Sequence, residues 1–154
     1  MSILLDIVKF DEVALRQETH EIEIPPSGDI KLLASNMIRA MINAKGLGLA
    51  APQVNRSERI FVTTFNEQYH IFINPTIVEL SDSTGTEVEE CLSLPGVSVP
   101  IKRPKFIRVS YYDAAGTFYE RKKFKRMDAR IIQHEYDHLE GKLISDYASS
   151  YELR

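Results

Sequence analysis

The sequence predicts an α+β fold, with antiparallel β-sheets packed around a C-terminal helix and residues 1–154 forming a single domain. Three observations support this prediction. Apolar residues recur at helical spacing in two segments, one in the first third of the chain and one near its end. Between them, short strand-like runs are separated by turns. No helix lies between successive strands, as a parallel sheet would require.

The first helix is predicted to follow segment 25–29, which contains two prolines and a glycine. The apolar positions that define it are Ile30, Leu33, Ala34, Met37, Ile38 and Met41. Their spacings of three and four place them on one helix face, and Ser27 or Asp29 is suited to cap the first turn. We expect Gly46 to end the helix and a loop to follow over residues 46–53.

Six strands are predicted in the middle of the chain, over residues 59–65, 69–74, 76–80, 86–90, 106–112 and 117–124. The first two flank a short polar turn, and the last two flank a turn that contains a glycine, so each pair is expected to form a hairpin. The last helix is predicted over residues 127–140, and Gly141 is expected to stop it.

Composition and charge exclude several classes of protein. The net charge of −3 and the pI near 5.8 do not indicate a general nucleic-acid binder, so no DNA partner is expected. The N-terminal segment has a short apolar run, an early Asp6 and no basic lead, so it does not resemble a signal or transit peptide. No apolar stretch approaches the roughly 20 residues of a membrane helix. We therefore expect a cytoplasmic protein without a membrane partner, and a monomer by default.

The strongest chemical signal is the segment Gln133-His134-Glu135-Tyr136-Asp137-His138. Two histidines four residues apart lie on one face of a helix, where both rings can bind one metal ion. Glu135, beside the first histidine, is placed to take a proton from a water at such a site. The alternative is a pair of hydrogen-bonded histidines in the core. A catalytic site of this type also needs a third protein ligand and an open position.

Met127 and Ile131 share the helix stripe of the two histidines, and we expect them to form the floor of an apolar pocket beside the metal. In the loop over residues 46–53, two glycines two positions apart indicate a backbone that another chain or a ligand approaches closely, although an ordinary turn fits equally well. The single cysteine, Cys91, is either an inert core residue or a functional thiolate, which would suit zinc or ferrous iron.

Taken together, these segments resemble the three motifs of the peptide deformylase family, which removes the formyl group from nascent N-formylmethionyl peptides. Gly-x-Gly-x-Ala-Ala-Pro-Gln is complete at residues 46–53, and Gln-His-Glu-x-Asp-His-Leu is complete at residues 133–139. The Glu-Gly-Cys-Leu-Ser motif is present at residues 89–93 with glutamate as its second residue. Order and spacing also match, and the likeness spans nearly the whole chain.

The resemblance implies one divalent metal ion per chain, held by Cys91, His134 and His138. Ferrous iron is the expected physiological ion, and zinc or nickel can replace it in purified protein. Glu135 would be the general base and later the proton donor to the leaving amine. The expected substrates are N-formylmethionyl nascent peptides.

The resemblance also assigns the oxyanion and peptide sites. The Gln53 side chain and the backbone N–H of Leu92 would hold the formyl oxygen. Gly48 would offer backbone to a peptide that pairs as an added strand. The methionine side chain would enter a pocket formed by Met127 and Ile131. The residues expected to line the peptide site are Gly46, Leu47, Gly48, Leu49, Glu89, Met127 and Ile131.

The sequence departs from the family pattern at two places. Glu90 replaces the usual small residue before the cysteine, and it would either strain the backbone, intrude on the pocket, or point outward and pair with a basic residue. We expect the outward orientation, because strand neighbours face opposite sides and Cys91 must face the metal. The end at Arg154 leaves little room for the long C-terminal helix that docks many bacterial members on the ribosome. The basic segment 121–126 is either a substitute surface for ribosomal RNA or a solvated strand end.

Two other functions share these features. A zinc metalloprotease also carries His-Glu-x-x-His, but its third ligand normally lies downstream, and no histidine follows His138. A non-catalytic relative would keep the metal for structure or peptide binding, and Glu90 is its only support in the motifs. Metal-dependent formyl hydrolysis is the function that the sequence favours.

Overall fold

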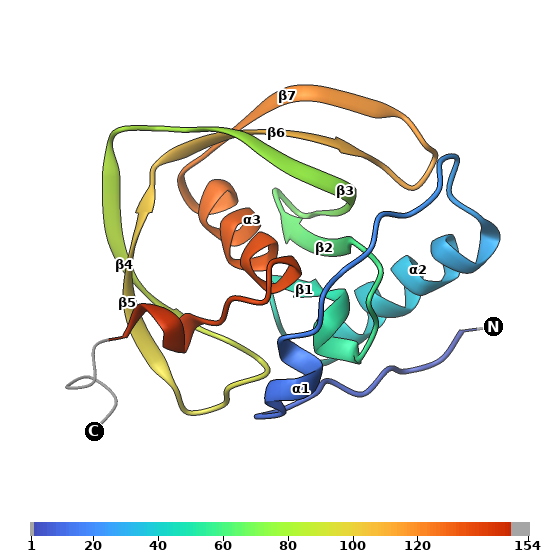
Figure 1. The fold of residues 1–154 in the computed structure, drawn as a ribbon, viewed down its shortest axis with the longest axis horizontal. Helices are drawn as coiled ribbons and strands as arrows, with labels where there is room; N and C mark the ends of the chain where they lie inside the picture. The colour runs from blue at the N-terminus through green and yellow to red at the C-terminus, as the bar shows by residue number, and fades with distance from the viewer. Residues whose placement is uncertain (1, 149–154) are drawn as a thin grey trace.

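The computed structural model describes residues 2–148 (Figure 1). Residue 1 and residues 149–154 lie outside this range, and the latter include the last six residues of the tail in which no long helix is expected. The helices are α1 (Glu12–Leu15), α2 (Gly28–Asn43) and α3 (Arg126–Leu139), with the 3-10 turns η1 (Ala51–Val54) and η2 (Ile144–Tyr147). The strands are β1 (Gly48–Ala50), β2 (Ile60–Phe65), β3 (Gln68–Leu80), β4 (Thr84–Glu90), β5 (Ser98–Pro104), β6 (Phe106–Tyr112) and β7 (Phe118–Lys125).

The strands form two sheets, and every strand pair in them is antiparallel. One sheet has the order β1-β2-β3-β6-β7, and the other consists of β4 and β5. Figure 1 shows α3 enclosed by the strands, with β4 and β5 on one side and β1 and β2 on the other. The predicted α+β class with sheets around the C-terminal helix is therefore confirmed.

Helix α2 forms where the apolar stripe predicted a helix, and it covers the β1-β2 end of the larger sheet. The Ser27 hydroxyl caps it by accepting a hydrogen bond from the Ile30 N–H at 3.3 Å. Met37 and Met41 are fully buried on its inner face. The prediction that Gly46 ends this helix is wrong, because the helix ends at Asn43 and Lys45 takes the left-handed conformation with φ 59°.

The middle of the chain differs from the prediction in three strands. The segments 69–74 and 76–80 form one strand, β3, whose register shifts between Ile73 and Thr76. Asn74, with φ 50°, lies in this irregularity, and its side chain exchanges two hydrogen bonds of 2.8 Å with the Ile22 backbone. Strand β1 lies inside the expected loop, and β5 was not predicted.

Strand β5 was not predicted because its alternation of buried and exposed residues is not matched by an alternation of apolar and polar residue types. Its buried positions are Val99, Ile101 and Arg103, so an arginine stands where an apolar residue is expected. Prolines at both Pro100 and Pro104 also argued against a strand. β5 can hold them because it pairs on one side only, with β4.

Helix α3 forms the centre of the core between the two sheets. Ala129, Ile132 and Leu139 are buried against the aromatic side chains Phe61 and Phe72 of the larger sheet. This packing fixes one face of α3, so its opposite face is directed toward β4, β5 and the loop before β1. Within residues 2–148, no helix combines the length and the apolar composition that crossing a bilayer requires.

Candidate metal centre and substrate groove

Helix α3 and the end of β4 bring three potential metal ligands together. His134 and His138 lie one turn apart on α3, and Cys91 directly follows β4. Their ligand atoms all lie within 4.8 Å of one another. Gly141, with φ 73°, follows the helix at the predicted position. The structure therefore unites the three residues that the sequence singled out as ligands.

The donor atoms fit a divalent metal ion. Metal–sulfur and metal–nitrogen bonds of about 2.3 and 2.0 Å at a tetrahedral angle separate the two donors by roughly 3.5 Å. The Cys91 Sγ lies 3.4 Å from the His138 Nε2. A buried oxygen beside this group, Glu135 Oε1, has no hydrogen-bond partner within the described part of the chain. One thiolate and two imidazoles form a donor set that suits zinc or ferrous iron.

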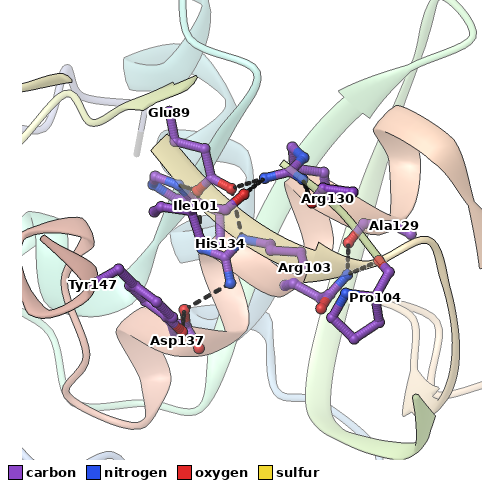
Figure 2. Close-up of polar contacts among 11 residues, drawn as sticks. Glu89, Ile101, Arg103, Pro104, Ala129, Arg130, His134, Asp137 and Tyr147 are labelled. Carbon is purple, nitrogen blue, oxygen red and sulfur yellow. Dashed lines mark hydrogen bonds and ion pairs between the residues drawn. The ribbon is translucent and has the colours of Figure 1, made fainter. Parts of the chain in front are cut away.

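His134 is oriented by a buried carboxylate that the sequence assigned to another role. Its Nδ1 lies 2.9 Å from Glu89 Oε1, so its Nε2 is left for the metal. Glu89 was expected to line the substrate site, and it borders the groove. Its carboxylate, however, is occupied by His134 and two arginines (Figure 2). Its carboxylate is therefore engaged by His134 and the arginines, while its contact with substrate stays a prediction.

Two arginines that sequence reasoning missed hold Glu89 in place. Arg103 donates to both Glu89 oxygens at 2.6 and 2.9 Å, and Arg130 donates to Oε2 at 2.6 Å. Arg103 also donates to Asp137 at 2.9 Å, which accepts a second hydrogen bond, of 2.6 Å, from the Tyr147 hydroxyl (Figure 2). A sequence signal for Arg103 does exist, because it occupies the same face as Val99 and Ile101 in β5. This signal can be used only after β5 has been recognised as a strand.

Arg130 also ties α3 to both strands of the smaller sheet. Its guanidinium donates to the carbonyl oxygens of Ile101 in β5 at 3.0 Å and Gly85 in β4 at 2.8 Å. Gln133 adds a bond of 3.1 Å to the Pro104 carbonyl (Figure 2). The helix that carries the histidines is thus hydrogen-bonded to the strand that leads into Cys91.

Burial and these contacts shift the ionisation of the site. Burial raises the pKa of Glu135 to about 7, which suits a group that takes and returns a proton near neutral pH. Burial opposes ionisation of Glu89, but hydrogen bonds from Arg103 and His134 outweigh it and lower its pKa to about 2. Burial and the neighbouring His134 hold the pKa of His138 well below its usual value, so its ring is neutral and able to bind a metal.

Gln53 lies beside Cys91 with its amide orientation fixed. Its Oε1 accepts a hydrogen bond from the Ala50 N–H at 3.0 Å. Its Nε2 therefore faces the site, 3.1 Å from Ser93 Oγ and 3.6 Å from Cys91 Sγ. Leu92 follows Cys91 and lines the same cavity. The two expected oxyanion donors therefore lie next to the metal ligands.

The glycines of the first motif are required by close packing. A Cβ on Gly48 would lie 2.5 Å from Glu135 Oε2, and a Cβ on Gly46 would lie 2.7 Å from the Leu92 side chain. Neither glycine has a left-handed backbone, so space alone selects them. Both glycines are therefore closely approached by side chains of the same chain, whereas the predicted approach by another chain or a ligand stays a prediction.

These residues open onto a groove with a volume of about 970 Å³. Ile131 is nearly buried in its lining, whereas Met127 and Leu47 are about half exposed at its rim. Leu49 was expected to line the peptide site, but this is wrong. It is fully buried in the core cluster that also contains Ile60 and Val62.

Glu90 points outward, as expected, but its partner differs from the prediction. Its φ is not in the left-handed region, so the backbone strain considered as one outcome is absent. Its carboxylate accepts a hydrogen bond from Ser98 Oγ at 3.0 Å rather than pairing with a basic residue. Glu90 is exposed at the border of the groove.

Comparison with known proteins gives a consistent result. The sequence profile of the family described as polypeptide deformylase matches residues 4–154. The peptide deformylase of Dictyoglomus turgidum is 42% identical, covering 95% of this chain and 94% of that protein. The crystal structure of the Thermotoga maritima peptide deformylase superposes with a TM-score of 0.90 at 36% identity, covering 96% of this chain and 99% of that one. A Met-Ala-Ser-bound peptide deformylase from Acinetobacter baumannii gives a TM-score of 0.89 at 30% identity, covering 96% and 100%.

Proposed function

The chain belongs to the peptide deformylase family, a group of metal-dependent hydrolases that remove the N-formyl group from nascent polypeptides, and on this basis we propose the role of each site residue. Cys91, His134 and His138 hold the metal ion. The observation that carries this proposal is the convergence of their three ligand atoms within 4.8 Å, beside the buried Glu135. When bound, the ion supplies a Lewis acid that lowers the pKa of a water molecule toward neutrality.

We propose that Glu135 moves the proton. Its buried carboxylate, with a pKa of about 7, accepts a proton from the attacking water and returns it to the amine of the leaving peptide. Gly48 packs directly against this carboxylate and limits its freedom. A fixed position near the reacting atoms favours proton transfer without reorganisation of the site.

Gln53 and Leu92 are proposed to stabilise the oxyanion. The Gln53 amide is held by Ala50 and Ser93, so its N–H points into the site before substrate binds. A pre-oriented donor of this kind contributes on the order of 3 kcal/mol to the transition state. The backbone N–H of Leu92 is the proposed second donor.

The groove is proposed to bind the formylated peptide as an added strand. β1 and β4 both lie at an edge of their sheets, and residues of both edges border the groove. Unpaired strand edges can bind an extended peptide through backbone hydrogen bonds. The methionine side chain would lie toward α3, against Ile131 and Met127. The Met-Ala-Ser complex of the Acinetobacter baumannii enzyme supports a peptide in this groove.

Several broader assignments also remain proposals. Residues 1–154 are taken as one catalytic domain with Fe²⁺ as the physiological ion, and Zn²⁺ or Ni²⁺ as replacements in purified protein. The protein is proposed to act as a cytoplasmic monomer. The basic segment 121–126 forms the end of edge strand β7 and the start of α3, and its contact with ribosomal RNA stays a prediction.

The proposal is tested by measuring formate release from formyl-Met-Ala-Ser with anaerobically prepared ferrous protein. Turnover above the metal-free control is expected. A Glu135→Gln variant should retain one metal per chain but lose turnover by roughly 10²- to 10⁴-fold, the usual contribution of a general acid–base. A Cys91→Ser variant should instead lose metal. Formate release that is unchanged in Glu135→Gln would overturn the assigned role.

A further inference from the structure

The acidic residue beside the cysteine lies on a strand edge that borders the substrate groove. In the described part of the chain, β4 pairs with β5 only, so its second edge is free. Val88, Glu89 and Glu90 at the end of this strand all line the groove. A peptide bound as an added strand would therefore run beside Glu90.

The two faces of β4 are distinct at this end. Glu89 is buried and faces α3, where it bonds with His134. Val88 and Glu90 are exposed on the opposite face. In the β4-β5 register they lie opposite Pro100 and Ser98, which are exposed as well. Glu90 is therefore part of a solvent-facing surface, away from the metal.

Strand alternation then places the second residue of the substrate. This inference rests on the proposed function, in which the formyl group lies at Cys91 and the methionine side chain points toward α3, on the Glu89 face. Successive side chains of a strand point to opposite faces. The side chain that follows the methionine therefore falls on the outer face, next to Val88 and Glu90.

The charge of this outer position is negative. Glu90 accepts one hydrogen bond from Ser98 and has no ion-pair partner among residues 2–148. The basic residues that line the groove are Lys9 on the N-terminal segment, Lys45 after α2, and Arg130 on α3, which pairs with Glu89, so none of them lies on β4. A neighbouring strand that brings a cation to Glu90 gains a cross-strand pair, and one that brings an anion meets repulsion.

We propose that Glu90 is a specificity-determining residue, which favours formylated peptides with lysine or arginine directly after the methionine over those with an acidic residue there. Cross-strand charge pairs are weak when exposed. The expected ratio of kcat/KM between formyl-Met-Lys-Ser and formyl-Met-Glu-Ser is about three- to tenfold at low salt. Salt should reduce this ratio, because an exposed pair is screened.

The test measures kcat/KM for formyl-Met-Lys-Ser, formyl-Met-Gln-Ser and formyl-Met-Glu-Ser at low and high salt. Glu90→Gln should bring the Lys-to-Glu ratio close to one, and Glu90→Lys should invert it. The matched control is Glu87→Gln, which removes the same charge from a β4 residue that also borders the groove but belongs to the Glu89 face. This control should retain the wild-type ratio.

Three results would overturn the proposal: a wild-type ratio of one, a wild-type ratio retained in Glu90→Gln, or an equal change in Glu87→Gln, which would reveal a general field effect. The neutral substrate formyl-Met-Gln-Ser separates this test from that of the proposed function. Its hydrolysis by the wild-type protein shows that deformylation proceeds, whatever the charge preference. Absence of hydrolysis of all three substrates would contradict the proposed function itself.

Discussion

The two walls of the groove are held in place by different kinds of contact. On the side of β4, β5 and α3, a buried carboxylate, Glu89, is surrounded by Arg103, Arg130 and His134. On the side of β1, the backbone of Gly48 packs against Glu135 with no room for a side chain. The first, here called the polar wall, positions the proposed metal ligand His134 through charged hydrogen bonds. The second, here called the close-packed wall, positions the proposed general base Glu135 through steric contact.

The two histidine rings of α3 are likewise oriented by different kinds of contact. His134 depends on the polar wall for the orientation of its ring. His138 is fully buried, and its Nδ1 has no hydrogen-bond partner within residues 2–148, so packing and the 3.4 Å contact of its Nε2 with Cys91 Sγ orient the ring. A change in the polar wall should therefore act on stability and metal binding, whereas a change in the close-packed wall should act on proton transfer.

The largest effect is expected from breaking the polar wall with Glu89→Gln. The variant removes the shared anion of the buried Arg103 and the part-buried Arg130, and breaking a buried ion pair typically costs about 3–5 kcal/mol. Urea unfolding of the metal-free protein at pH 7 measures this loss. The exposed neighbour Glu87→Gln is the control, and it should change stability by less than about 0.5 kcal/mol. Similar losses in both variants would contradict the importance of the buried network.

The same carboxylate predicts the acid sensitivity of the fold. Its folded-state pKa of about 2 lies below its ordinary value of 4.5. Its contribution to stability is therefore complete above pH 4.5 and is lost as the pH falls toward 2. The stability difference between wild type and Glu89→Gln should narrow over this range, and a constant difference would show that the charge of Glu89 is not its source.

An intermediate effect is expected from Gly48→Ala in the close-packed wall. The new Cβ would lie 2.5 Å from Glu135 Oε2, so the carboxylate must move. A displacement of about 1 Å near the reacting atoms costs roughly 100-fold in rate. Metal content should stay at the wild-type value while kcat falls. Gly85→Ala in β4 is the matched control, because its Cβ would meet nothing closer than 3.5 Å, and its kcat should be unchanged.

The two walls also differ in how far sequence predicts them. The close-packed wall could be predicted, because glycine spacing and the position of Gln53 are local features of one segment. The two histidines were equally visible, because helical periodicity relates them. The polar wall could not be predicted. Arg103 and Arg130 become partners of Glu89 only when β5, β4 and α3 meet, and an arginine in a strand signals exposure by default.

The same contrast accounts for the smaller errors. Leu49 was placed in the pocket because its motif surrounds the site, but a three-residue strand directs it into the core. Pro75 divided one strand into two predicted strands, whereas in the structure β3 continues through this point with Asn74 hydrogen-bonded to the distant Ile22. In each case the deciding contact joins residues that are far apart in the chain.

The smallest effect is expected at the outer end of the polar wall, from Tyr147→Phe. The Tyr147 hydroxyl donates to Asp137 at 2.6 Å, and its ring lies 5.1 Å from the Arg103 guanidinium. The substitution removes one hydrogen bond but keeps the ring, and Asp137 retains its bond from Arg103. A loss of about 1 kcal/mol in unfolding free energy is expected. Tyr147→Leu should lose more, because it also removes the aromatic face under the cation. If Tyr147→Phe lowers the unfolding free energy as much as Glu89→Gln does, the hydrogen bond of Tyr147 contributes as much to stability as the buried carboxylate. The expected decrease in stabilisation from Glu89 outward to Tyr147 would then be contradicted.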